Sequence, residues 1–99
     1  MREISAAQIT EVVKRLSIEA NCHLPQDVKS CIEGCYAAET WAPAREILER
    51  IMENYNIADN ENVPVCQDTG VCCVFLKIGQ EVHINGNIED AVNEGVRQG

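Results

Sequence analysis

A thiol, an amide, a carboxylate and a hydroxyl follow one another in the second half of the chain. They belong to Cys66, Gln67, Asp68 and Thr69, with a proline two residues before the thiol and a glycine directly after the hydroxyl. An apolar run follows, and functional groups are commonly placed where a loop meets a regular element. A plain turn is the competing interpretation, because Asp and Thr side chains also bond to nearby backbone groups in turns. The residues alone leave both interpretations open.

A second group of possible ligands lies nearer the N-terminus and comprises Cys22, His23, Cys31 and Cys35. Cys31 and Cys35 are one helical turn apart and could reach one metal ion, but an adjacent Cys-His pair is not a usual zinc-ligand spacing. Both cysteines also fit the apolar stripe of a helix, where free cysteine packs as a small hydrophobe. We favour packing, and keep a small zinc- or thiol-based binding module as the alternative. His83, within a strand pattern, is interpreted as structural.

Three amphipathic helices are predicted ahead of the polar motif. Ser5 and Gln8 have the spacing of a capping box and start the first helix, which residues 21–23 end. Pro25 suits the first position of the second helix. Thr40 is the expected cap of the third. The apolar stripe of the second helix comprises Val28, Cys31, Ile32, Cys35 and Tyr36, and that of the third comprises Ala44, Ile47, Leu48, Ile51 and Tyr55.

A β-hairpin and a last helix are predicted after the motif. The hairpin pairs residues 71–78 with 82–84 across a Gly-Gln turn, and Asn87 caps the helix with Asp90 at the capping-box position. The predicted fold is α+β and mainly α, in a single domain over residues 1–99. Its parts are helical residues 1–58, a linker at 59–63, a motif loop and hairpin at 64–86, and a helix at 87–99. Two strands alone are marginal in water, which suggests a fragment of a larger domain.

Composition excludes several classes of protein. Ninety-nine residues make one domain at most. The net charge is −8 and the eight basic residues are scattered, so nucleic acids and anionic membranes are poor partners. No apolar run approaches the roughly 20 residues of a transmembrane helix. Six cysteines without a signal-peptide pattern indicate a reduced, cytoplasmic protein rather than a secreted disulfide scaffold.

The motif Pro64-Val65-Cys66-Gln67-Asp68-Thr69-Gly70 resembles the P-x-C-Q-D-T-G motif of the class I fumarate hydratase and L-tartrate dehydratase family. Its flanks are similar as well. Residues 38–40 look like the family's E-T element, and residues 82–97 look like the segment that follows the motif in fumarate hydratases. The resemblance spans essentially the whole chain, and a seven-residue motif in such a context is much more specific than a lone glycine-rich fingerprint.

The resemblance implies a 4Fe-4S cluster held by three cysteines, with one iron open to the substrate. It makes Cys66 one thiolate ligand, in keeping with the preference of such clusters for sulfur donors. It makes Gln67, Asp68 and Thr69 substrate-binding residues, with Asp68 also catalytic, near the proton or hydroxyl being moved. The implied function is the N-terminal portion of an iron–sulfur hydro-lyase that interconverts fumarate and malate, and L-tartrate dehydratase is an alternative.

Length is the departure from the family. Family members are longer, and the other two cluster cysteines and the cationic groups that bind dicarboxylate lie downstream of the motif. We therefore expect the 99-residue chain to be inactive alone. We expect it to act with the remainder of the enzyme or a beta subunit, in a homo- or hetero-oligomer, on a small dicarboxylate substrate.

Overall fold

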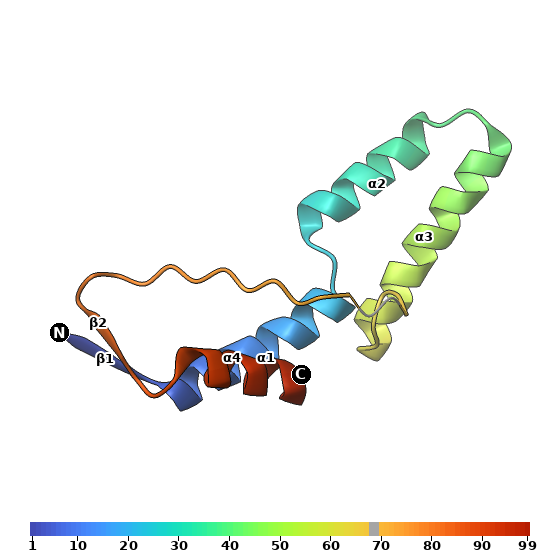
Figure 1. Ribbon diagram of the computed structural model, residues 1–99. Coiled ribbons are helices and arrows are strands. Elements are labelled where there is room, and N and C mark those ends of the chain that lie inside the picture. Colours follow the sequence, from blue (N-terminus) through green and yellow to red (C-terminus); the bar gives the residue numbers. More distant parts are fainter. Residues whose placement is uncertain (68–69) are drawn as a thin grey trace. The chain divides into compact units, whose positions relative to one another are not determined.

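The computed structural model describes residues 1–67 and 70–99 (Figure 1). The elements, in chain order, are β1 (Arg2–Ser5), α1 (Ala6–Cys22), α2 (Gln26–Ala38), α3 (Ala42–Glu61), β2 (Val82–Asn85) and α4 (Ile88–Gln98). The predicted class, α+β and mainly α, is confirmed. Within the described residues, none of these helices has the length and apolar character needed to cross a membrane.

The described residues form two compact units. The first combines residues 1–19 with 70–99, and the second is Ala20–Gln67. Each has a small core of its own: Val13 and Ala91 are buried in the first, and Cys22, Tyr55 and Ala58 in the second. The prediction that residues 1–99 belong to one domain stays a prediction.

The first unit begins with the predicted helix start. The Ser5 backbone N–H donates to Gln8 Oε1 at 2.9 Å, and the Gln8 N–H donates back to Ser5 Oγ at 3.2 Å. This exchange is the capping box, and it satisfies two amide groups that have no partner inside the helix. At the other end of the chain, the Asp90 N–H donates to Asn87 Oδ1 at 3.0 Å and caps α4 as predicted.

Helices α1 and α4 approach closely because small residues of α4 face α1. A Cβ atom placed on Gly95 would lie 2.7 Å from both the Thr10 carbonyl oxygen and Val13 Cβ, distances that packed carbons do not reach. The Thr10 hydroxyl also donates to the Ala91 carbonyl at 2.9 Å. Glycine at position 95 is therefore a packing requirement.

The predicted hairpin is wrong, although a two-stranded sheet does exist. Strand β2 pairs with β1 in parallel, from Arg2 opposite Val82 to Ser5 opposite Asn85. The Val82 N–H donates to Gly79 O at 3.2 Å and closes the predicted turn. The Glu81 carbonyl, however, accepts from the Arg2 N–H at 2.8 Å, so the chain after the turn pairs with β1. Pairing with a distant strand has replaced pairing with the sequence neighbour.

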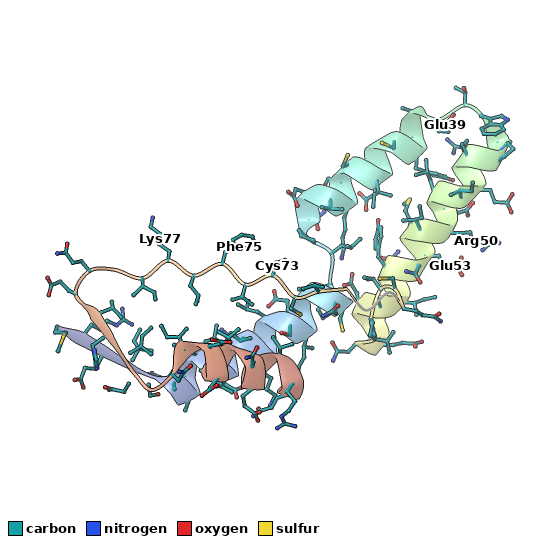
Figure 2. All side chains as sticks on the ribbon, viewed as in Figure 1. Glu39, Arg50, Glu53, Cys73, Phe75 and Lys77 are labelled. Carbon is teal, nitrogen blue, oxygen red and sulfur yellow. The ribbon has the colours of Figure 1, made fainter. Side chains whose placement is uncertain are left out.

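Residues 71–78, the expected first strand of the hairpin, form an extended segment outside any sheet (Figure 1). Val74, Phe75 and Leu76 line one side of a groove of about 370 Å³, whose other side includes Val12 and Leu16 of α1. Phe75 is nevertheless 94% exposed, and it projects from the segment on the same side as Lys77 (Figure 2). The segment thus carries strand-like residues without a strand partner among the described residues.

The second unit is built on the antiparallel pair of helices α2 and α3. Arg45 closes the connection between them: its Nη1 donates to Tyr36 O at 2.7 Å and Glu39 O at 3.1 Å, and its guanidinium lies 4.2 Å from the Tyr36 ring centroid. The Glu39 carboxylate accepts the N–H groups of Thr40 and Trp41. The residue at the N-cap of α3 is therefore Trp41 rather than the predicted Thr40.

The packed face of α2 is rotated from the predicted stripe. Cys31 and Cys35, expected to pack in the core, are exposed, while Lys29, Ile32 and Tyr36 are half-buried. The physical reason is that Lys29 bonds to an anionic side chain on α3, described below. A charged residue therefore lies on the face where the sequence pattern predicted apolar residues. The cysteine that does pack is Cys22, which is 5% exposed.

Helix α3 extends further than predicted. It continues through Glu61, so the polar residues 59–61 of the expected linker form its last turn. Asn62 then adopts the left-handed conformation, with φ 53° and ψ 50°, and its N–H bonds to Ala58 O. Asparagine tolerates this conformation better than most residues, which explains a helix end without glycine.

Candidate functional site

The backbone just ahead of Cys66 is anchored at two points. The Val65 N–H donates to the Asn21 carbonyl, in the last turn of α1, at 2.8 Å. The Val65 carbonyl accepts from Asn54 Nδ2, on α3, at 2.6 Å. Both polar groups of one loop residue are thus satisfied by two different helices, all within the second unit.

Cys66 and Gln67 follow this anchor directly. Cys66 is a free, exposed thiol, and Gln67 is exposed beside it. Asp68 and Thr69, the other two predicted site residues, lie outside the described residues. The structure therefore places the predicted metal ligand and one predicted substrate-binding amide at the end of an anchored loop.

A charged cluster ties α3 to the junction between α1 and α2. Asp59 Oδ1 lies 2.8 Å from His23 Nδ1, and its other oxygen accepts from Lys29 Nζ. Hydrogen bonds from Lys29 and then His23 lower the pKa of Asp59 below its usual value. Asp59 is therefore held as the anion at neutral pH. Its two partners are Lys29 on α2 and His23 just before α2.

The ring of Tyr55 extends this cluster into the core. Lys29 Nζ lies 5.3 Å from the ring centroid, and the Tyr55 hydroxyl donates to Glu33 Oε1 at 3.2 Å. Burial, and then the hydrogen bond to Glu33, raise the pKa of Tyr55 above its usual value. Sequence patterns gave no indication of this cluster, since its members are spread over residues 23–59 and share no motif.

The candidate zinc ligands do not assemble. His23 is bonded to Asp59, Cys22 is buried, and Cys31 and Cys35 are exposed on α2. Across the part of the chain that the structure describes, no three or more His, Cys, Asp and Glu side chains are grouped so as to hold a metal ion. The four residues proposed for a zinc module therefore form no such site in this structure.

Residues 10–99 match the family described as fumarate hydratase (Fumerase). The chain belongs to this family. It is 41% identical over 93 residues to a putative L(+)-tartrate dehydratase subunit alpha of Methanocaldococcus jannaschii. The matched region covers 92% of this chain and 33% of that protein. It is 26% identical over 91 residues to the L(+)-tartrate dehydratase subunit alpha of Escherichia coli K12, covering 92% of this chain and 30% of that protein. The chain spans about a third of the length of these two curated relatives.

Proposed function

We propose that this chain is the part of an iron–sulfur hydro-lyase that supplies one cluster ligand, Cys66, for the reversible hydration of fumarate to malate. The observation that carries the proposal is an exposed thiol directly after a doubly anchored residue, in a chain of the fumarate hydratase family. An exposed thiol on a held backbone can meet a metal group without first rearranging the loop.

The donor chemistry of the loop fits this assignment for one ligand. Thiolate is the form of cysteine that binds metals, and sulfur donors suit iron–sulfur clusters. Cys66 is free and exposed, so its sulfur is accessible to a metal group. The remaining ligands come, in this proposal, from the rest of the protein or from a partner chain.

The bound cluster would supply a Lewis acid that polarises the substrate hydroxyl and carboxylate. This chain would contribute polar groups beside it. The Gln67 amide can donate to a substrate carboxylate and accept from a hydroxyl. Asp68 is proposed to hold or move the proton at the reacting carbon or oxygen, and Thr69 to hydrogen-bond the substrate.

L-tartrate is the second candidate substrate, because both relatives described above are named tartrate dehydratases. Both are also named alpha subunits, which supports a beta subunit as the partner of this chain. All six cysteines are free, and we propose a reducing compartment, the cytoplasm, as the place of action.

The test uses the full-length protein, with its partner subunit where one exists, purified without oxygen. Iron, sulfide and the electron paramagnetic resonance of the cluster are measured for the wild type, Cys66→Ser and the matched control Cys31→Ser, which changes another exposed thiol. We expect Cys66→Ser alone to lose the intact cluster and hydratase activity. Turnover of fumarate against L-tartrate then decides the substrate. A full cluster in Cys66→Ser would contradict the proposal, and zinc in place of iron would revive the binding-module alternative.

A further inference from the structure

Asn54 makes one hydrogen bond whose position matters more than its strength. The side-chain amide donates to the Val65 carbonyl at 2.6 Å, and the next residue along the chain is Cys66. Asn54 lies in the interior of α3, seven residues from the last residue of that helix, Glu61. The donor is therefore carried by a regular element rather than by another loop.

The Val65 carbonyl and the Cys66 N–H belong to the same planar peptide unit. The bond from Asn54 holds the carbonyl oxygen, and so constrains the orientation of that plane. The bond from the Val65 N–H to Asn21 O, at 2.8 Å, holds the preceding plane. With both planes held, the direction of the Cys66 sulfur depends chiefly on φ and χ1 of Cys66 itself.

The two anchors are held relative to each other by the charged cluster. Asp59 lies on α3, five residues after Asn54, and it bonds to His23, two residues after Asn21. Lys29 of α2 binds the same carboxylate. The side chains of His23, Lys29 and Asp59 thus link the residues just after α1 to the last turn of α3, five residues beyond Asn54.

We propose that Asn54 is a positioning residue for the Cys66 thiol. It presents the sulfur to an incoming metal group by fixing the peptide plane before it. The inference rests on the proposed function only in taking Cys66 as the ligand. The anchoring itself, in which a side-chain amide supplies one of the two hydrogen bonds that hold Val65, applies to the protein before any cluster is bound.

The first experiment measures amide hydrogen exchange of the metal-free full-length protein. The Val65 N–H is the probe, because it is itself one of the anchoring donors. Asn54→Ala removes the bond, and Asn54→Asp keeps the size but replaces the donor with a carboxylate that faces a carbonyl oxygen. Loss of one hydrogen bond predicts roughly fivefold faster exchange at Val65 in Asn54→Ala, and at least as much in Asn54→Asp.

Asn56→Ala is the matched control. Asn56 is an exposed asparagine of the same helix, and its side chain makes no hydrogen bond to the described residues. It should leave exchange at Val65 unchanged. Equal exchange at Val65 in all variants would overturn the inference, as would faster exchange spread evenly over α3, which would indicate a general loss of helix stability.

The second experiment reconstitutes the same proteins with iron and sulfide and measures cluster content and its resonance spectrum. We expect Asn54→Ala and Asn54→Asp to assemble the cluster several-fold more slowly than the wild type, and Asn56→Ala to match it. A cluster that forms normally in both Asn54 variants but not in Cys66→Ser overturns the positioning role and leaves the proposed function standing. A cluster that forms in Cys66→Ser overturns the proposed function, while the exchange result at Val65 still decides the anchoring by Asn54.

Discussion

Replacing Gly95 with alanine tests the packing of α4 on α1. The added Cβ would lie 2.7 Å from Thr10 O and from Val13 Cβ, whereas ordinary contact begins near 3.4 Å, so the helices must separate by roughly 0.7 Å. Overpacking of this kind costs about 1–3 kcal/mol. The separation also weakens the bond from Thr10 to Ala91 O, which contributes about 0.5–1.5 kcal/mol.

Helix propensity acts in the opposite direction. Alanine is favoured over glycine inside a helix by about 1 kcal/mol. We therefore expect Gly95→Ala to destabilise the first unit by about 1–3 kcal/mol in total. For a domain of this size, each kcal/mol lowers the melting temperature by about 4–8 °C.

Gly34→Ala is the matched control, because a Cβ at this position of α2 meets nothing within 4 Å. Only the propensity gain remains, so the same substitution should raise stability by about 0.5–1 kcal/mol. Urea unfolding followed by circular dichroism gives the two signs, and hydrogen exchange locates the change in α1 and α4 or in α2. A Gly95→Ala protein as stable as Gly34→Ala would refute the close helix contact.

Three further predictions concern single side chains. Thr10→Val should lower the free energy of unfolding by about 0.5–1.5 kcal/mol, measured in urea, because it deletes the donor to Ala91 O and keeps the shape; unchanged stability would contradict it. Arg97, and then Gln98, hold the pKa of Glu94 at about 2, below its ordinary 4.5, so the stabilisation is full above pH 4.5 and is lost as pH falls toward 2. Urea titrations of Glu94→Gln and the wild type should therefore differ at neutral pH and converge near pH 2, and a constant difference would refute the linkage. Alkylation of the native chain should modify Cys22 last, since the other five cysteines are exposed, and mass spectrometry showing early modification of Cys22 would contradict its burial.

Local sequence patterns predicted the starts of α1 and α4, whereas the N-cap of α3 is Trp41 and not the predicted Thr40. The capping boxes at Ser5 and Asn87 depend on residues three apart, and both hydrogen bonds are present in the structure. Such contacts form within one helical turn, so the sequence contains both partners side by side.

Contacts between distant residues were not predictable in the same way. Strand β1 has four residues and pairs with β2 about 80 positions later, so neither its length nor its pattern identified it. The rotation of α2 depends on Lys29 meeting Asp59, a charge pair that apolar periodicity does not detect. The anchoring of Val65 by Asn54 and Asn21 is of this kind too, which is why the motif identified Cys66 but not the residues that hold its loop.

The extended segment at residues 71–78 exposes the isolated chain to aggregation. None of its backbone N–H and C=O groups is hydrogen-bonded within the described residues, and Val71 and Phe75 are more than 90% exposed. An unpaired, β-branched-rich row of this length is a template on which another chain can add and begin an aggregate. Lys77 is the one charge in the segment and acts as its gatekeeper, aided by the net charge of −8 that keeps copies apart. High salt, which screens that repulsion, should therefore turn a clear solution of this chain turbid sooner than low salt does.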